Sequence, residues 1–465
     1  MTSTLWIAPY TRSENQLSIS FGIDDLRFST SYWYNDVSLI ELEHRFGIEY
    51  MEKIYFHIIA FEANKLVSLK PDLFHLGVFE KYHTPEFEKL WLDIQRNVWG
   101  QWRYENNLPD YSGPRLSGRA AKRASNCVQV DENNREILLF CGGGKDSLVS
   151  LRILDRAGFP YSTCAYSNSI YGQSAHQHRL IGSLLDTANP KRQHKIWIHE
   201  DFLDSPVIEL TKKRHRIVSI TAAETPSSIF ASLPIVLQHN YRYIGLGHER
   251  SADFPNLIWE RTGEAINHQW GKSTEAEKLL NTYLRDHLIS NCQYFSLLKP
   301  IYDIVIFNLL RQDLISVPFT HSCNTIKPWC KKCAKCAYVW LNYMAYLPIP
   351  LIDGMFRDNL FDILENQLWF RQLLGLEGHT PFECIGQIDE SRLAFALCRS
   401  KGLTGKAMRM FVEEVKGFDI DSSINEYTTV DYDYPLIPPE IANGILPLME
   451  AGAENSKEYL KDLLS

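Results

Sequence analysis

A glycine-rich loop between an apolar run and a helical pattern constrains this chain more than any other feature. Residues 137–140 (ILLF) have the pattern of a buried strand, residues 142–147 (GGGKDS) follow Cys141, and a helix is predicted over 147–157. Three glycines allow a tight turn in which several backbone N–H groups point at one spot, and the start of the helix adds positive potential. The pattern predicts a phosphate site at the end of a strand in an α/β fold.

The polar side chains of this loop suit ATP and Mg²⁺. Lys145 and Ser147 offer a cation and a hydroxyl to a phosphate, and Asp146 could hold Mg²⁺ or fix the loop. The Walker spacing is absent, and a dinucleotide fingerprint would need glycine at Ser147. A glycine-rich turn without a ligand is the alternative interpretation. The candidate nucleotide-binding residues here are Gly142, Gly143, Gly144, Lys145, Asp146 and Ser147.

The loop resembles the Ser-Gly-Gly-x-Asp-Ser motif of the PP-loop ATP pyrophosphatases. Cys141 stands where that family has its first serine, so one hydroxyl contact is missing. The resemblance implies that ATP is cleaved between its α and β phosphates. Pyrophosphate would leave, and the substrate would become an adenylate.

Length and periodicity divide the chain into several predicted units. A chain of 465 residues is too long for one core. We predict an N-terminal α+β domain over 1–111, a linker over 112–134, a doubly wound parallel-sheet domain over 135–290 and a mainly helical C-terminal domain over 291–465. The predicted strands lie within 16–34 and at 137–140, 161–166, 195–199 and 243–246. The predicted helices lie within 39–69 and 86–105, and at 147–157, 175–185, 217–223 and 227–239.

Composition excludes several classes of partner. A net charge of −8 argues against general nucleic-acid binding. The longest apolar stretch, near 338–352, is too short and too interrupted to span a membrane, and the N-terminus lacks a signal-peptide pattern. We therefore expect a cytoplasmic protein that acts on a small molecule. The sequence does not indicate an oligomeric state.

Four cysteines have metal-ligand spacing. Cys323, Cys330, Cys333 and Cys336 form C-x6-C-x2-C-x2-C, and four thiolates could surround Zn²⁺ with Zn–S of about 2.3 Å. Such a site has no open position, so its zinc would be structural. An iron–sulfur cluster and free cysteines are the alternatives. A similar cluster occurs in 7-cyano-7-deazaguanine synthase, which is a PP-loop enzyme.

Further motifs follow the loop in a fixed order: 248–252 (HERSA), 267–273 (NHQWGKS), 296–300 (SLLKP), 329–336 (WCKKCAKC) and 381–386 (PFECIG). With 142–149 (GGGKDSLV), these resemble the ATP-dependent UDP-N-acetylmuramoyl-L-alanyl-L-glutamate epimerases from about residue 55 to about residue 400. His248 stands where that family has asparagine, and Trp270-Gly271 replace Tyr-Ser. These departures leave a related peptide open as the substrate.

The resemblance implies an isomerase of peptidoglycan precursor synthesis. It would adenylate the α-carboxylate of the terminal L-glutamate of UDP-N-acetylmuramoyl-L-alanyl-L-glutamate and invert the α-carbon, which gives D-glutamate, AMP and pyrophosphate. Arg250 is a candidate clamp for phosphate or carboxylate.

Inversion needs an acid and a base on opposite faces of the α-carbon. The candidates are Cys384, His268, Lys272 and Glu383, and we expect Cys384 to oppose His268 or Lys272. A buried apolar role for Cys384, a structural role for His268 and a pair between Glu249 and Arg250 are the alternatives.

Two other functions fit part of the sequence. One is a PP-loop ligase of the 7-cyano-7-deazaguanine synthase type, which acts on a deazapurine in queuosine precursor synthesis or phage defence. The other is a nucleotide sensor without activity, against which the intact Lys145, Asp146 and Ser147 argue. The motifs outside the loop favour the epimerase.

Overall fold

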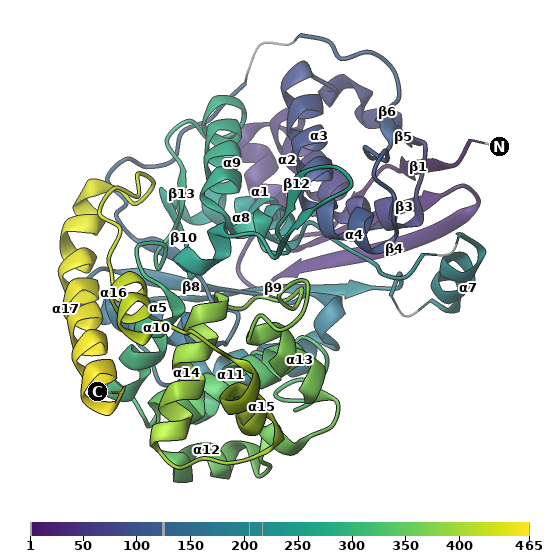
Figure 1. The fold of residues 1–465 in the computed structure, drawn as a ribbon. Coiled ribbons are helices and arrows are strands. Elements are labelled where there is room, and N and C mark those ends of the chain that lie inside the picture. The colour runs from purple at the N-terminus through teal and green to yellow at the C-terminus, as the bar shows by residue number, and fades with distance from the viewer. Residues whose placement is uncertain (1, 123–125, 204, 216, 465) are drawn as a thin grey trace.

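The computed structural model describes residues 2–122, 126–203, 205–215 and 217–464. Residues 123–125, within the predicted linker, lie outside the described residues. The chain forms a mixed sheet of eleven strands with helices on both faces, together with a two-stranded sheet of β11 (Leu257–Trp259) and β12 (Glu264–Ile266) (Figure 1). The predicted α/β class is confirmed.

The middle of the large sheet is parallel. Its strands lie in the order β13-β10-β7-β8-β9 and consist of β7 (Ile137–Phe140), β8 (Tyr161–Tyr166), β9 (Gln193–Glu200), β10 (Tyr243–Leu246) and β13 (Gln293–Ser296). The chain runs outward from β7 through β8 and β9, and then returns to the other side of β7 with β10. The order therefore reverses between β7 and β10, which is where open α/β sheets bind ligands at their carboxyl edge.

The N-terminal strands extend this sheet. β4 pairs antiparallel with β9, in a register that runs from Thr30 opposite Glu200 to Tyr34 opposite Ile196. β3, β1, β5 and β6 continue outward, and β2 pairs with β3. These strands are β1 (Thr4–Ile7), β2 (Thr11–Arg12), β3 (Gln16–Ile23), β4 (Leu26–Tyr34), β5 (Leu73–His75) and β6 (Arg115–Leu116). Both predicted strands within 16–34 are present as β3 and β4.

The helices around the sheet belong to two hydrophobic cores. One core contains α1 (Leu39–Phe46), α2 (Ile48–Ala63), α3 (Pro85–Val98), α4 (Gly100–Glu105), α8 (Glu224–His239) and α9 (Thr274–His287). The other contains α5 (Lys145–Ala157), α6 (Ser174–Leu185) and the helices that follow β13. α7 (Pro206–His215) lies away from the parallel strands in the middle of the sheet (Figure 1).

After β13, every regular element in the described part of the chain is helical, as the sequence predicted. These α-helices are α10 (Asp303–Leu309), α11 (Ala334–Tyr346), α12 (Ile349–Phe356), α13 (Asn366–Leu373), α14 (Ile388–Ser400), α15 (Lys406–Glu414), α16 (Ile420–Tyr427) and α17 (Pro439–Leu464). Short 3-10 helices are η1 (Asn64–Leu69), η2 (Gly77–Tyr82), η3 (Ser169–Tyr171), η4 (Arg250–Asp253), η5 (Trp270–Lys272), η6 (Leu310–Gln312), η7 (Val317–Phe319) and η8 (Leu360–Asp362). Among the described residues, none of the helices combines the length and apolarity that a membrane span requires.

The helix predicted over 217–223 is wrong. This segment has no regular secondary structure and leads into α8, which begins at Glu224. Side chains of the N-terminal region bind its backbone: the Thr221 N–H donates to Ser68 Oγ (2.8 Å) and the Ala223 N–H to Asn64 Oδ1 (3.3 Å). These long-range bonds replace the helical ones and place the segment beside the pocket described below.

Candidate active site

The glycine loop forms the turn between β7 and α5. Gly143 has φ of +81°, a conformation that glycine adopts without strain. The N–H groups of Gly142 and Gly143 both donate to Ser147 Oγ, at 3.1 and 3.2 Å. The loop thus presents convergent N–H donors, as predicted, and a bound phosphate oxygen would compete with the Ser147 hydroxyl for them.

Lys145 is buried between two carboxylates. Its Nζ lies 2.5 Å from Asp146 Oδ1 and 2.5 Å from Asp303 Oδ1, at the start of α10. Burial lowers the pKa of Lys145, but the charges of Asp146 and Asp303 raise it more, so the ammonium group stays protonated. Oxygens of Asp146, Glu249 and Asp303 all lie within 4.8 Å of one another, and such a set of oxygen ligands fits Mg²⁺.

The segment before the cysteines covers the glycine loop, which the sequence did not reveal. The His321 N–H donates to the Gly143 carbonyl (2.8 Å), and a Cβ at Gly143 would lie only 2.2 Å from His321 Nε2. Neither ring nitrogen of His321 has a hydrogen-bond partner among the residues that the structure describes. His321 is therefore a further candidate for contact with a phosphate oxygen. No local motif indicates this, because the two segments meet only in the folded chain.

The loop after β10 packs directly on the glycine loop. A Cβ at Gly247 would lie 2.9 Å from Ser150 Oγ and 3.3 Å from the Asp146 carbonyl oxygen. Beyond it, the Arg250 guanidinium stacks on the Tyr302 ring at 4.8 Å and has no ion pair within the described residues. The position and the lack of a carboxylate partner suit Arg250 to an anionic ligand.

Glu249 connects the glycine loop to a second set of charges. Burial raises the pKa of Glu249, but the positive charges of Lys145, Lys272 and Lys335 lower it to about 2. Its carboxylate therefore interacts with lysines rather than forming the pair with Arg250 that the sequence left open. Lys145 belongs to the loop and Lys272 to η5, so Glu249 lies between the two.

A pocket of about 270 Å³ adjoins η5. The four predicted acid–base residues line it, and the irregular segment 219–223 forms part of its wall. Its polar lining includes Gln101, Tyr171, Glu224, His268, Lys272, Asn324, Glu383 and Cys384. The structure thus brings together residues from α4, η3, α8, η5 and the loops around the cysteines.

Cys384, His268 and Lys272 form one contact group. His268 Nδ1 donates to Gln101 Oε1 (2.6 Å), and the ring also hydrogen-bonds Cys384, as does Lys272. Burial raises the pKa of the Cys384 thiol, but the Lys272 charge and the His268 hydrogen bond outweigh it, so the net pKa lies below the usual value. Lys272 and His268 thus stabilise the thiolate form of Cys384.

The carboxylate of Glu383 is held by hydrogen bonds beside this group. Its Oε1 accepts from Asn324 Nδ2 (2.6 Å) and from the Cys384 N–H (2.9 Å). Lys335 donates to the Cys384 carbonyl. These bonds fix the turn that presents the Cys384 thiol.

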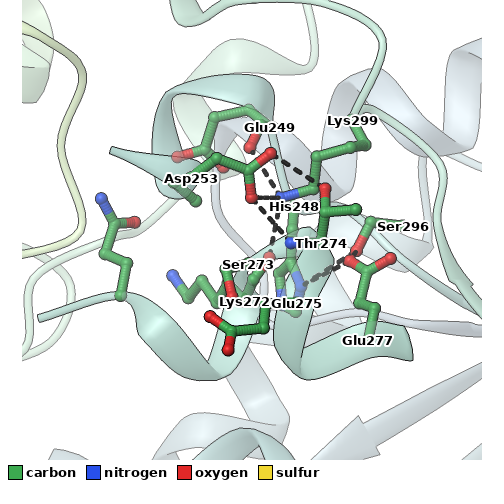
Figure 2. Close-up of polar contacts among 12 residues, drawn as sticks. His248, Glu249, Asp253, Lys272, Ser273, Thr274, Glu275, Glu277, Ser296 and Lys299 are labelled. Carbon is green, nitrogen blue, oxygen red and sulfur yellow. Dashed lines mark hydrogen bonds and ion pairs between the residues drawn. The ribbon is translucent and has the colours of Figure 1, made fainter. Parts of the chain in front are cut away.

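Lys299 belongs to the motif 296–300 and connects it with the motifs 248–252 and 267–273, as Figure 2 shows. Its Nζ donates to the carbonyl oxygens of Lys272 (2.7 Å) and Glu249 (3.3 Å) and pairs with Asp253 (3.3 Å). Because Lys299 is 1% exposed, these contacts satisfy a charge that would otherwise be costly to bury. Lys299 thus holds η4 and η5 together.

His248 belongs to the same network. Its Nδ1 lies 3.0 Å from Ser296 Oγ, and the Ser296 hydroxyl donates to Glu277 (Figure 2). Burial and the charges of Lys272 and Lys299 lower the pKa of His248, so the ring is neutral. His248 therefore stabilises the loop that follows β10.

The four cysteines converge between η7 and α11. Cys323 and Cys333 Sγ are 3.8 Å apart, as are Cys330 and Cys336 Sγ, and all four lie within 4.8 Å of one another. A tetrahedron with Zn–S of about 2.3 Å has edges of about 3.8 Å. Backbone N–H groups of Thr325 and Ile326 also point at Cys323 Sγ. The cluster has the geometry of a four-thiolate metal site.

Comparison with known proteins identifies the family. A model described as the MurL N-terminal domain matches residues 76–185 and 218–297, and one described as the MurL C-terminal domain matches residues 318–417. The chain belongs to the MurL family. The MurL N-terminal match contains the glycine loop, Arg250 and the η5 residues, and the MurL C-terminal match contains the four cysteines and Cys384, so the pocket lies where the two matched regions meet.

Three curated relatives are named UDP-N-acetyl-alpha-D-muramoyl-L-alanyl-L-glutamate epimerase. The protein of Micromonospora sp. is 30% identical over 64% of this chain and 64% of its own length. That of Salinispora tropica is 31% identical over 58% and 57%, and that of Xanthomonas oryzae pv. oryzae is 27% identical over 65% and 65%. The chain thus spans less than two thirds of the length of these relatives.

The cysteine geometry gives a prediction for this MurL-family chain. We expect native mass spectrometry to find one Zn²⁺ per chain, and Cys333→Ser to lose it and to lower Tm by several degrees, because metal binding stabilises the folded state. Cys127→Ser is the matched control, since Cys127 lies outside the cluster and donates to the Asp286 carbonyl. Bound iron, or a wild-type chain without metal, would contradict the zinc site.

Proposed function

We propose that this MurL-family protein is an ATP-dependent epimerase in peptidoglycan precursor synthesis. It would adenylate the α-carboxylate of the terminal L-glutamate of UDP-N-acetylmuramoyl-L-alanyl-L-glutamate, or of a closely related peptide, and invert the α-carbon. The names of the three relatives support the substrate and the reaction.

One observation supports the proposal most: the buried Glu249 interacts with the glycine loop and with the pocket that contains Cys384. Glu249 interacts with Lys145 of the loop and with Lys272, which hydrogen-bonds Cys384 in the pocket. A carboxylate bound between them would reach both the α-phosphate of ATP and the Cys384 thiol. That proximity is what an enzyme needs to activate a carboxylate and then remove the neighbouring proton.

The loop would serve the activation step. The N–H groups of Gly142 and Gly143, with Gly144, Lys145 and Ser147, would bind the departing pyrophosphate, and Arg250 would bind the substrate carboxylate or a phosphate. Asp146, Glu249 and Asp303 would hold Mg²⁺, which supplies positive charge to the phosphates when bound. The adenylate removes the negative charge of the glutamate carboxylate, so the α-proton becomes acidic enough to be abstracted.

The Cys384 group would perform the proton transfer on one face. The thiolate form is favoured beside His268 and Lys272, and a thiolate is a suitable base for an α-proton. His268 is held by Gln101, and Glu383 fixes the turn before Cys384. Water would then release the product and AMP.

The test is a coupled product assay. The protein is incubated with ATP, Mg²⁺ and UDP-N-acetylmuramoyl-L-alanyl-L-glutamate, and D-glutamate is measured after hydrolysis together with AMP. We expect both to form. Absence of both would overturn the proposal for this substrate, and AMP formed only with 7-carboxy-7-deazaguanine and ammonia would indicate a deazapurine ligase instead.

A further inference from the structure

The Cys384 group alone cannot invert a carbon. Inversion needs proton removal from one face and proton delivery to the opposite face. A His268 ring nitrogen, a Glu383 carboxylate oxygen and the Cys384 Sγ lie within 4.8 Å of one another, and the Lys272 charge acts on the same thiol, so we take this group to act on one face of a bound substrate. If the proposed function holds, the second proton must come from another part of the pocket.

Glu224 and Tyr171 form a separate polar pair in the same pocket. The Tyr171 hydroxyl donates to Glu224 Oε2 (2.6 Å). Tyr171 ends η3 and Glu224 begins α8, whereas the Cys384 group comes from η5 and the loop 381–386. Both side chains are partly exposed to the pocket, and Glu224 has no ion pair within the described ranges.

The surroundings of Glu224 suit a proton donor. Burial raises the pKa of Glu224, although the Tyr171 hydrogen bond and the charges of Lys272 and His268 oppose the shift. Its place in the first turn of α8 stabilises the carboxylate that remains after the proton leaves. A carboxyl with a raised pKa is better suited to proton donation near neutral pH than an unshifted one.

The other acids of the pocket are already engaged. Glu105 accepts from Gln101 Nε2 (2.7 Å) and from Ser219 Oγ (2.6 Å), one bond on each oxygen. Glu383 is bound to Asn324 and to the Cys384 backbone. Neither acid therefore matches Glu224 as a source of the second proton.

We propose that Glu224 is the second catalytic residue, which delivers a proton to the face of the α-carbon opposite Cys384, and that Tyr171 is its positioning residue. The Cys384 thiolate takes the α-proton, and the C–H electron pair moves into the adenylated carbonyl as an enolate. The enolate carbon then takes the Glu224 proton as a new C–H bond forms on the other face. Solvent reprotonates Glu224 and removes the thiol proton of Cys384, so the cycle closes without an oxidant or reductant.

The experiment follows hydrogen at the α-carbon in D₂O with ATP, Mg²⁺ and UDP-N-acetylmuramoyl-L-alanyl-L-glutamate. For Glu224→Gln we expect D-glutamate formation to fall about 100-fold or more, with AMP formation retained. The recovered L-glutamate should contain deuterium, because Cys384 still removes the proton, the thiol exchanges with D₂O, and a deuteron returns to the same face. Tyr171→Phe should give an intermediate ratio of deuterated L-glutamate to D-glutamate.

The control is a tyrosine–glutamate pair outside the pocket. Tyr243 donates to Glu440 at the start of α17, so Glu440→Gln removes a similar contact and should keep wild-type D-glutamate formation. AMP formation by Glu224→Gln shows that the variant is folded. Wild-type D-glutamate formation by Glu224→Gln, or AMP formation with neither exchange nor inversion, would overturn the role of Glu224. If the wild-type protein forms no D-glutamate, the proposed function itself fails.

Discussion

Replacing Cys384 by serine is expected to lower D-glutamate formation about 1000-fold or more while AMP formation continues. The hydroxyl of serine has a far higher pKa than a thiol, so His268 and Lys272 cannot hold it as an anion. The residues proposed for adenylation do not include Cys384, so ATP cleavage should persist. Measuring AMP and D-glutamate in the same reaction separates the two steps.

The exchange experiment adds a sharper criterion for Cys384→Ser. With the L-glutamate substrate in D₂O, this variant should incorporate no deuterium, in contrast to Glu224→Gln. Cys127→Ser is the matched control, because Cys127 lies outside the pocket and donates to a backbone carbonyl. Wild-type inversion by Cys384→Ser would remove the thiol from the mechanism.

Replacing Gly143 by alanine is expected to lower AMP formation about 100-fold or more, because the loop donors would be displaced. Alanine is strained at φ of +81°, and its Cβ would lie 2.2 Å from His321 Nε2. The loop and the His321 segment would have to separate, which moves the N–H groups of Gly142 and Gly143. D-Glutamate formation should fall in parallel, since the adenylate precedes inversion.

The control for Gly143→Ala is Gly182→Ala. Gly182 lies within α6, and a Cβ there would meet nothing within 4 Å. Alanine favours a helix more than glycine does, so this variant should be at least as stable as the wild type and fully active. Full AMP formation by Gly143→Ala would contradict the phosphate role of the loop.

Much of the fold was predictable because its signals are local. Period-2 alternation predicted β3 and β4, and short apolar runs predicted β7, β8, β9 and β10 close to their observed bounds. β13 was missed because Gln293–Ser296 is short and is buried as an edge strand only after β10 has formed beside it. The helix over 217–223 was wrong because side chains of Ser68 and Asn64 bind N–H groups of that backbone, which forms no regular structure.

The sequence predicted individual residues of the candidate site but not how the fold brings them together. The motifs indicated Cys384, His268 and Lys272, and the structure brings them into one contact group. Gln101, Tyr171 and Glu224 belong to no motif, and each reaches the pocket from a different element. The acid–base roles of all these residues stay predictions until the variants are measured.

The amino-acid order was sufficient for features whose partners lie close in the chain. A strand, three glycines and a helix start make convergent N–H donors, and closely spaced cysteines can turn their thiolates toward one point. These local features are enough to predict an ATP site at the loop.

Which charged side chains surround the loop, and which residues share the pocket with Cys384, depended on the tertiary structure. The order of β7 and β10 in the sheet placed Glu249 between Lys145 and Lys272. The packing of η3 and α8 placed Tyr171 and Glu224 in the same pocket as Cys384. Such distances arise from strand pairing and helix packing between distant segments, and no local spacing encodes them.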